Sequence, residues 1–276
     1  MRWMMSYMLV SNEKVIAEEW KKYAGYTVRP LPSTCAYYKE LIQSDSNEES
    51  FLIYGGTPEI RSIFQELNLK VTLTDQSELI VHAMGYLTNA ATPIAANEEL
   101  IVTNWLNLEG VTDDSCDLLI GDDAINMVGW TQFDLFLSNA HRVLKHDGVF
   151  ICHLLVKPAE YFITNTIDDV RREYEDGMIR TQYDLASRLN FICYDTNSYA
   201  MGWQKTIEQL GINQLDQFKP KFDFVGTFGR CNSKFYCPPQ DAFEHLLDQY
   251  FHIEEIFYPH EYEYCQFEPV YVLRKK

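Results

Sequence analysis

An apolar run that stops at two glycines and then opens a helix constrains the fold of this chain more than any other feature. The run covers residues 51–54, the turn reads Gly-Gly-Thr-Pro-Glu over 55–59, and Asp75 follows at the end of a second apolar run. Glycines lack a Cβ, so the backbone can turn sharply there and approach a ligand closely. A carboxylate at the tip of the next strand can accept hydrogen bonds from both ribose hydroxyls. The pattern predicts a nucleotide or nucleoside pocket.

The chemistry of the turn narrows the choice of ligand. A dinucleotide site requires G-x-G-x-x-G, which places the pyrophosphate on free helix N–H groups, and this turn lacks that spacing. Pro58 has no N–H to donate, and Glu59 would repel a phosphate. Both suit a ligand without phosphates, because proline is tolerated in the first helical turn and a carboxylate there interacts favourably with the helix dipole. We infer S-adenosylmethionine (SAM), although an ordinary tight turn explains the two glycines alone about equally well.

Strands and helices alternate regularly after residue 50. Each predicted strand is short and apolar, as expected when both faces of a sheet are covered. We predict strands at 51–54, 70–74, 100–103, 117–121 and 149–156, and helices at 57–68, 76–86 and 131–144. Gly148 is expected in a turn, in the left-handed conformation. Five strands in βα alternation predict an α/β fold with a doubly wound, mostly parallel sheet.

The domain organisation follows from where this alternation stops. Residues 1–50 read as an N-terminal helical cap, and 51–157 with 239–276 as the ligand-binding core. Between them, 158–238 carry two predicted long helices, at 159–175 and about 180–210, followed by a turn-rich segment. We interpret 158–238 as a helical insertion that forms a substrate lid. A helix at 240–251 and strands at 252–258 and 269–274 close the chain.

Charge and composition exclude several kinds of partner. The formal net charge of −17 disfavours nucleic acid, which binds through clustered Lys and Arg, so a neutral or cationic small molecule fits better. Seven cysteines form no C-x-x-C pair, and the histidines form no H-E-x-x-H motif, so we expect reduced thiols and no metal. No run approaches the eighteen or more apolar residues of a membrane span. We therefore expect a cytoplasmic protein without a membrane or nucleic-acid partner.

The order of these features resembles class I SAM-dependent methyltransferases. The shared features are the strand, the Gly-Gly turn, the acidic strand tip, a third strand followed by Trp105, a Gly-Asp loop after the fourth strand and a Leu-Lys-x-x-Gly turn before the fifth. The resemblance covers about 51–156 and the last forty residues. It implies a seven-stranded sheet in which the final strand, 269–274, is inserted antiparallel. The usual G-x-G-x-G signature is degenerate, since here it reads Tyr-Gly-Gly-Thr-Pro.

The resemblance also implies roles for particular residues in binding SAM. Asp75 would bind the ribose hydroxyls, Gln76 and Ser77 would flank the ribose, and Gly55 and Gly56 would line the methionine part. Asn104 stands where the family often has an acidic residue at the adenine, and an amide can accept from the adenine amino group or donate to a ring nitrogen. Trp105 or Leu106 would pack against the adenine face. The predicted cofactor residues are Tyr54, Gly55, Gly56, Thr57, Asp75, Gln76, Ser77, Asn104, Trp105, Leu106, Gly121 and Asp122.

Gly121, Asp122 and Asp123 stand at the end of the fourth strand, where the family places the sulfonium and the methyl acceptor. Asp122 is the predicted catalytic residue, because a carboxylate there can steer a cationic acceptor or take its proton. A solvated loop that caps a helix is the alternative interpretation. Methyl transfer needs little side-chain chemistry beyond positioning and exclusion of water. His153 and Trp130 can shape the acceptor side or simply pack.

These features predict a SAM-dependent methyltransferase that acts on a small, neutral or cationic molecule by in-line methyl transfer. The degenerate glycine turn motivates an alternative, a SAM-binding regulatory or interaction protein without methyl transfer. A nicotinamide-dependent oxidoreductase is disfavoured by Pro58 and Glu59. The acceptor atom, the pathway and the oligomeric state are left open by the sequence.

Overall fold

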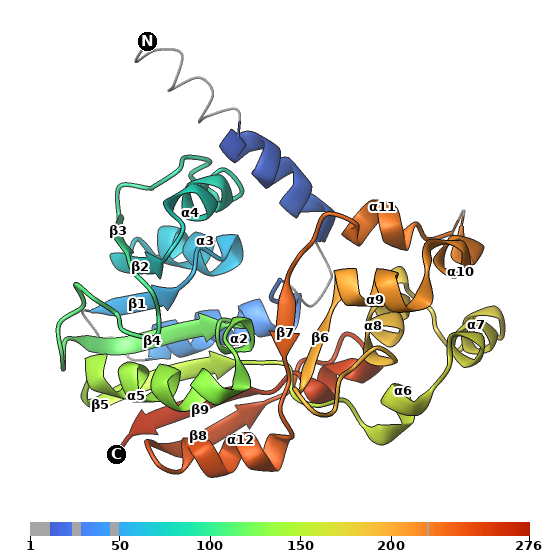
Figure 1. Ribbon diagram of the computed structural model, residues 1–276. Helices are drawn as coiled ribbons and strands as arrows, with labels where there is room; N and C mark the ends of the chain where they lie inside the picture. The colour runs from blue at the N-terminus through green and yellow to red at the C-terminus, as the bar shows by residue number, and fades with distance from the viewer. Residues whose placement is uncertain (1–11, 24–28, 45–49, 220) are drawn as a thin grey trace.

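The centre of the molecule is a seven-stranded sheet with the strand order β3-β2-β1-β4-β5-β9-β8 (Figure 1). The computed structural model describes residues 12–23, 29–44, 50–219 and 221–276. β1 to β5 pair in parallel, and β9 lies antiparallel between β5 and β8. The predicted seven-stranded sheet with an antiparallel final strand is confirmed. Its strands are β1 (Phe51–Tyr54), β2 (Val71–Asp75), β3 (Glu98–Val102), β4 (Cys116–Asp122), β5 (Leu144–His153), β8 (Phe251–Phe257) and β9 (Val270–Lys275).

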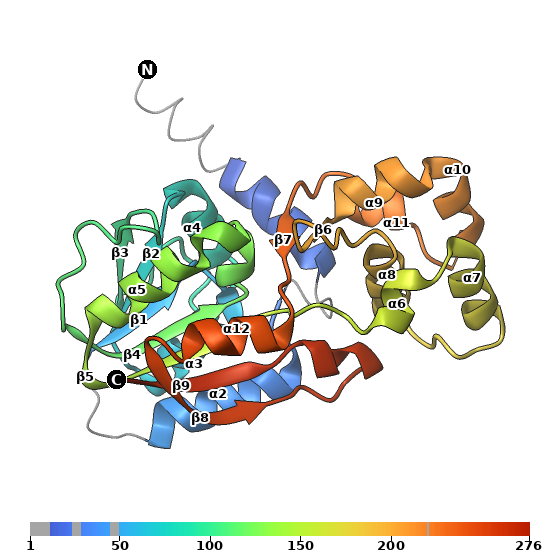
Figure 2. The same cartoon turned by 60° about the horizontal axis from the view of Figure 1, so that its bottom comes forward.

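Helices cover both faces of this sheet (Figure 2). On one face lie α2 (Pro32–Ser44), α3 (Pro58–Leu67) and α4 (Glu78–Gly85), whose apolar side chains share a core with the sheet. On the other face lie α5 (Phe133–Val143) and α12 (Gln240–Leu247). Every residue of β1 is buried, because helices pack on both sides of it.

The helix α3 illustrates how the sequence builds these layers. Ile60, Ile63 and Phe64 recur at helical spacing and are buried against the sheet. Pro58 occupies the first turn, where its missing N–H costs nothing, and the helix ends at Asn68 in the left-handed conformation. The carboxyl end of β1 and the start of α3 are therefore fixed at one edge of the sheet.

Residues 158–238 lie outside the sheet and form a group of short helices beside it (Figure 1). The predicted long helices are wrong, because local side-chain bonds break them. Thr166 caps a new helix with Asp169 in a reciprocal capping box, and Asp195 binds the N–H of Asn197 in a turn that leads into a strand. The elements are α6 (Glu160–Thr164), α7 (Ile167–Glu175), α8 (Gln182–Phe191), β6 (Ala200–Gly202), α9 (Trp203–Leu210), α10 (Ile212–Leu215), η4 (Asp216–Phe218), α11 (Phe224–Phe228) and β7 (Lys234–Tyr236).

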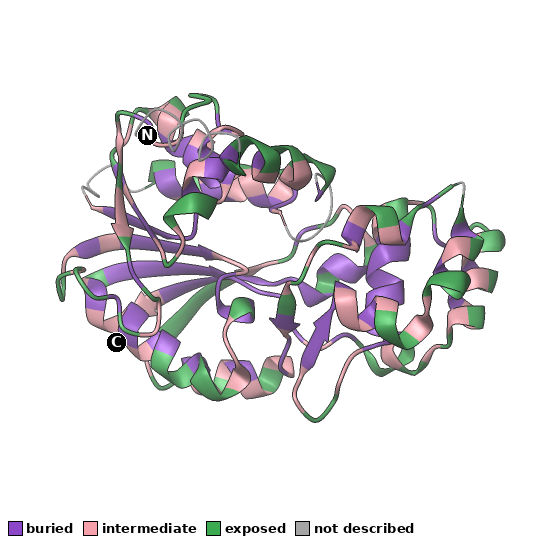
Figure 3. Cartoon of the chain, turned by 45° about the horizontal axis from the view of Figure 1, so that its top comes forward, coloured by how far each residue is buried: buried purple, intermediate pink, exposed green. Residues whose placement is uncertain are grey.

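The buried side chains of these short elements belong to the same core as one face of the sheet. Phe191, Phe224 and Phe228 are at most 1% exposed, and Figure 3 shows buried positions within both the sheet and the inserted helices. β6 pairs with β7 in an antiparallel ribbon, and β7 lies against η2 (Ile125–Met127), the turn that follows β4. The insertion is thus joined to the end of β4 as well as to its own two connecting segments.

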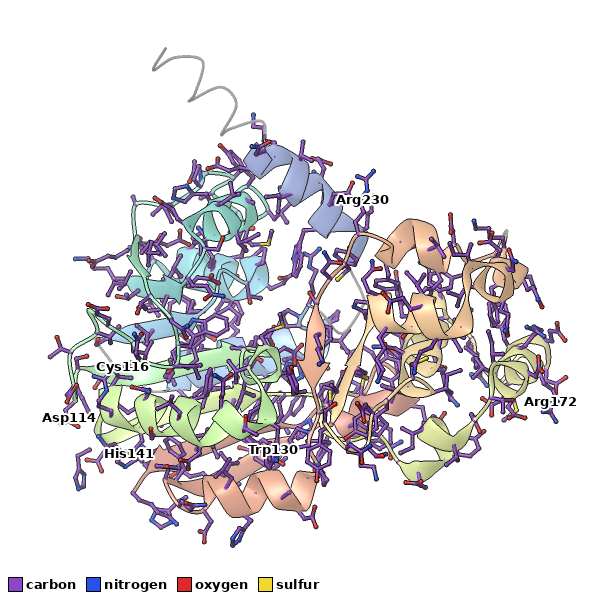
Figure 4. All side chains as sticks on the ribbon, viewed as in Figure 1. Asp114, Cys116, Trp130, His141, Arg172 and Arg230 are labelled. Carbon is purple, nitrogen blue, oxygen red and sulfur yellow. The ribbon has the colours of Figure 1, made fainter. Side chains whose placement is uncertain are left out.

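The N-terminal part of the chain connects the two groups of helices. A helix over 12–20 leads into η1 (Lys21–Tyr23), and Glu13 contacts His82 of α4 at 3.2 Å. At the other end, the ring of Tyr23 stacks on Phe228 of α11, with 5.7 Å between ring centroids. Arg230 lies beside the helix over 12–20, near Glu19 (Figure 4). The predicted cap therefore reaches across to the insertion, apart from 1–11, 24–28 and 45–49, which lie outside the described residues.

Gly148 differs from its prediction. It lies within β5, without a positive φ, at an irregularity in the pairing of β5 with β4. A Cβ at Gly148 would lie 3.0 Å from the carbonyl oxygens of Cys116 and Lys145. Glycine is therefore needed here for the close approach of two backbone segments.

All seven cysteines are free thiols, and five of them are buried. Across the described ranges, no group of three or more His, Cys, Asp or Glu side chains is arranged to hold a metal ion. In the same residues, no helix has both the length and the apolar character needed to cross a membrane.

Two short 3-10 turns complete the elements of the core, η3 (Trp130–Gln132) and η5 (Glu263–Phe267).

Candidate functional site

A cavity of about 470 Å³ opens at the carboxyl ends of β2 and β3. Its volume lies in the range of small-molecule sites, and its position at the carboxyl edge of parallel strands is the usual place for a ligand in such folds. Six of the predicted cofactor residues line it: Asp75, Gln76, Ser77, Asn104, Trp105 and Leu106. The remaining lining residues are Ile80, Thr103, Met127, Val128 and Gln132.

One carboxylate oxygen of Asp75 is hydrogen-bonded, and the other lies toward the glycine turn. Its Oδ1 accepts from the backbone N–H of Ser77 at 2.8 Å. Its Oδ2 lies 4.0 Å from the position that a Cβ on Gly55 would take. Burial raises the pKa of Asp75, while the N–H groups of Ser77 and Gln76 oppose that rise. This carboxylate is positioned to accept hydrogen bonds from ligand hydroxyls.

Trp105 forms a fixed wall between the turn and the cavity. Its Nε1 donates to the carbonyl of Thr74 at 2.8 Å, and the N–H of Gly55 donates to the same carbonyl at 2.7 Å. The indole lies 3.7 Å from where a Cβ on Gly55 would be, and the ring of Tyr54 packs beneath it. Gly55 has a φ of +93°, a conformation that favours glycine.

The other glycines serve packing. A Cβ on Gly56, which has no positive φ, would lie 3.1 Å from Cα of Val81, so this glycine lets α4 approach the turn. A Cβ on Gly121 would lie 3.3 Å from the ring of Phe150. Tyr54 is 1% exposed, and Thr57 begins α3 without a side-chain capping bond. These predicted cofactor residues lie behind the cavity and do not line it.

The first turn of α3 is closed by an ion pair. Arg29 Nε donates to Oε1 of Glu59 at 2.7 Å, and Arg29 Nη2 also contacts this oxygen. The side chains of Arg29 and Glu59 are 15% and 21% exposed. In a dinucleotide site, this helix N-terminus binds the pyrophosphate. Here the same place carries a largely buried carboxylate, which disfavours a phosphate.

Asp122, the predicted catalytic residue, bonds to the interior of the molecule. Its Oδ1 accepts from the hydroxyl of Tyr38 at 2.7 Å and lies 2.8 Å from Nδ1 of His153. The side chains of Asp122 and His153 are each 3% exposed. Burial alone would lower the pKa of His153, but the Asp123 and Asp122 carboxylates outweigh it and raise that pKa to about 9. Asp122 thus lies outside the 470 Å³ cavity, and its catalytic role stays a prediction.

The Asp122–His153 pair predicts that stability falls as the pH rises. The folded-state pKa of His153 lies above its ordinary value of about 6.5, so its contribution is fully present below that pH and is lost as the pH approaches 9. We expect the free energy of unfolding to fall more steeply between pH 6.5 and 9.5 in the parent protein than in His153→Gln, as measured by urea denaturation. His146→Gln, at a 94% exposed site, is the control. Parallel curves for the parent and His153→Gln would show that His153 folds uncharged.

The sequence reasoning missed the apolar residues of the cavity. Ile80 is 39% exposed and Met127 is 46% exposed, and together with Val128 they offer the apolar contacts that a flat heteroaromatic ring requires. The positions of these three residues in the sequence could have identified them. Met127 and Val128 follow the fourth strand at the edge where its loop must lie, and Ile80 is in the first turn of the helix after Asp75.

Trp130, which the sequence proposed for the acceptor side, packs between the core and the insertion. Its ring lies 5.0 Å from that of Phe133 and 5.8 Å from that of Tyr199, measured between centroids, and Figure 4 labels it near the foot of the inserted helices. This arrangement joins η3 to the start of β6. Trp130 therefore has a structural contact on each side.

No protein-family model matches the sequence, and the search of curated proteins finds no match. Solved structures do share its fold. A SAM-dependent methyltransferase from Methanosarcina mazei is 14% identical, with 85% of this chain and 96% of that chain covered and a TM-score of 0.52. The Burkholderia thailandensis 1,6-didemethyltoxoflavin N1-methyltransferase, solved with 1,6-didemethyltoxoflavin and S-adenosylhomocysteine, is 10% identical, with 88% and 78% covered and a TM-score of 0.50.

A Rhodobacter sphaeroides protein provisionally described as a zinc-dependent alcohol dehydrogenase is 12% identical, with 95% of this chain and 98% of that chain covered and a TM-score of 0.60. At these identities the likeness shows the fold alone. That fold is the one of class I SAM-dependent methyltransferases, as the sequence resemblance implied.

Proposed function

We propose that this protein is a SAM-dependent methyltransferase that acts on a small, neutral or cationic molecule. The observation that carries the proposal is the position of Asp75. Its carboxylate stands at the tip of β2, lines a cavity of suitable size and faces the glycine turn, in a sheet with class I methyltransferase topology. Ribose hydroxyls find their acceptor at this place in such folds.

Different residues of the cavity would contact the adenine, the ribose and the methionine part of SAM. Asn104 is exposed and its Oδ1 accepts from the N–H of Leu106 at 2.9 Å, so its Nδ2 would donate to an adenine ring nitrogen. Ile80 and Met127 offer apolar contacts to the flat base, and Gln76 flanks the ribose. Gly55 and the Trp105 indole lie where the methionine part would pass. The predicted contacts of Tyr54, Gly56, Thr57 and Gly121 are then indirect, through the shape of the turn.

In a methyl transfer, a bound sulfonium supplies an already activated methyl group. The protein has to align the acceptor with the carbon–sulfur bond and exclude water. The inserted helices and the N-terminal helix, which meet at Tyr23 and Phe228, provide the covering mass for this purpose. Residues 158–238 are accordingly proposed as the substrate lid.

A SAM-binding protein without methyl transfer is the second candidate. Trp105 lies against Gly55 and is hydrogen-bonded to Thr74, so it narrows the methionine side of the crevice. A protein that senses SAM without using it requires no open path from this side to an acceptor. The two candidates share the cofactor and differ only in turnover.

Calorimetric titration with SAM, S-adenosylhomocysteine and NAD tests the proposed cofactor. We expect both sulfur compounds to bind and NAD not to bind, because Glu59 and Pro58 disfavour a pyrophosphate at α3. Binding of NAD without SAM would overturn the proposal in favour of an oxidoreductase. Incubation with methyl-labelled SAM and metabolite extracts then separates the two SAM hypotheses, since only an enzyme transfers the label.

A further inference from the structure

A second cavity lies where the end of β4 meets the insertion. It is small and partly enclosed, with a volume of about 10 Å³. Asp123 lines it from the core side, and Asn190, Phe191, Trp203 and Phe235 are among the residues that line it from the insertion. The cavity therefore joins the strand end at which methyl acceptors are expected to the segment proposed as a lid.

Asp122 and Asp123 are adjacent, yet their carboxylates have different surroundings. Asp122 is bonded to Tyr38 and His153, while Asp123 has a φ of 53° and lines the cavity. A left-handed backbone is costly for a residue with a side chain and points to a constraint at this position. The N–H of Asp123 donates to the carbonyl of His153 at 3.1 Å, which holds it there.

Two polar groups at this cavity have no hydrogen-bond partner in the described part of the chain. They are Oδ1 of Asp123, whose nearest cationic atom is His153 Nδ1 at 3.8 Å, and Nε1 of Trp203. Trp203 is 2% exposed, and its ring is stacked on Phe228 with 3.9 Å between centroids, so it is fixed. A buried polar group without a hydrogen-bond partner is unfavourable. One acceptor and one donor are thus held ready on the same cavity.

Charge and shape identify the kind of ligand that meets both groups. The imidazole Nδ1 of His153 lies 2.8 Å from Asp122 and 3.8 Å from Asp123, and burial raises the pKa of Asp123 to about 7, so above that pH the two carboxylates leave the cluster negative even with His153 protonated. Phe191 and Phe235 add aromatic walls that are 1% and 7% exposed. A cation next to aromatic rings and a carboxylate is favourable, and a neutral alcohol gains much less there.

We propose that this cavity, opened by movement of the insertion, is the methyl-acceptor site, and that the acceptor is a small amine with a hydrogen-bond acceptor elsewhere in the molecule. The proposal rests on the proposed methyltransferase function and deepens it. The ammonium group binds Asp123, and the indole N–H of Trp203 donates to the second polar atom of the ligand. Asp123, and not Asp122, is then the residue that contacts the acceptor.

The reaction at Asp123 balances as follows. Asp123 takes one proton from the ammonium group, which frees the nitrogen lone pair. The nitrogen–carbon bond forms as the carbon–sulfur bond breaks, and that electron pair stays on sulfur. The positive charge passes from the sulfonium to the methylated nitrogen, and Asp123 releases its proton to solvent.

The proposed opening requires a hinge, and the two segments that link the insertion to the core are the place for it. Its two linking segments run side by side, with the N–H of Lys157 donating to the carbonyl of Pro238 at 2.8 Å. Asn126, in η2 just after Asp123, binds both segments through Leu155 and Tyr236. In the proposed opening, the insertion moves at these segments and Arg188 Nη2 separates from Glu263 of η5, to which it donates at 2.7 Å.

Tyramine and its alcohol analogue tyrosol are matched probes, because they differ only in the amine. We expect tyramine to bind the full-length protein and to accept label from methyl-labelled SAM, and tyrosol to do neither. Asp123→Asn should retain SAM affinity within about twofold and lose about a hundredfold or more in kcat/KM for tyramine, the usual effect of removing a general base. Trp203→Phe keeps the ring and should raise KM for tyramine severalfold at an unchanged kcat. Asp176→Asn, at an exposed position of the insertion, is the control.

Three results would overturn the assignment. They are tyrosol used as well as tyramine, tyramine binding that is unchanged in both variants, and full activity in Asp123→Asn. Failure of the parent protein to bind SAM has a different meaning, since it rejects the methyltransferase proposal itself. Tyramine binding measured by calorimetry without SAM tells the two failures apart.

Discussion

Replacing Asp75 with alanine is expected to weaken SAM binding by about tenfold to a hundredfold. A charge-assisted hydrogen bond contributes about 1.5 to 3 kcal/mol, and 1.4 kcal/mol corresponds to a tenfold change in affinity. The fold should survive, because Asp75 makes its hydrogen bond to the neighbouring N–H of Ser77 and not to the core. Calorimetric titration with SAM gives the affinity, and circular dichroism with thermal melting confirms folding.

Asp147→Ala is the matched control for this experiment. Asp147 is 89% exposed and lies near the start of β5, at the opposite end of the sheet from the cavity. The substitution Asp147→Ala removes one negative charge, as Asp75→Ala does, so any long-range effect of the acidic surface appears in both variants. Equal SAM affinity in Asp75→Ala and the parent, with both folded, would remove Asp75 from the site.

Replacing Asn126 with alanine is expected to lower the free energy of unfolding by about 2 to 4 kcal/mol. Asn126 is fully buried, and its Nδ2 donates to the carbonyls of Leu155 at 2.8 Å and Tyr236 at 2.7 Å. Its Oδ1 accepts from the N–H of Leu155 at 2.9 Å. Truncation leaves these backbone groups unsatisfied in the interior, each at a cost of about 1 to 3 kcal/mol, partly offset by relaxation. Urea denaturation measures the change.

The part of the chain that loses hydrogen-exchange protection shows whether Asn126 joins the two linking segments of the insertion or only packs in the core. Hydrogen exchange should accelerate in 158–238 of Asn126→Ala, while β1 and β4 retain their protection. Asn213→Ala, at an exposed position of α10, is the control and should change neither quantity. A change in unfolding free energy below about 0.5 kcal/mol, or uniform acceleration across the chain, would contradict the assigned role of Asn126.

Local patterns in the sequence specified the sheet well. The central strand β1 is an apolar run bounded by a serine and two glycines, and α3 and α5 carry apolar stripes at helical spacing, whereas the edge strand β8 has charged residues at exposed positions. Asp75 was predictable for the same reason, since the end of a parallel strand fixes the edge to which its side chain belongs. The insertion was less predictable, because capping by Thr166 and the turn at Asp195 outweighed a helical composition.

The sequence by itself thus determined the positions of the core strands and the place of Asp75 at the end of one of them, because both depend on residues close together in the chain; the order of the strands in the sheet came from the structure. Only the tertiary structure distinguishes the surroundings of Asp122 from those of Asp123. Tyr38, 84 residues away on α2, and His153 on β5 bind Asp122, and Asp123 is left to face Trp203 of the insertion. Two adjacent carboxylates are equivalent in sequence, and the partners that separate them come from segments that only folding brings together.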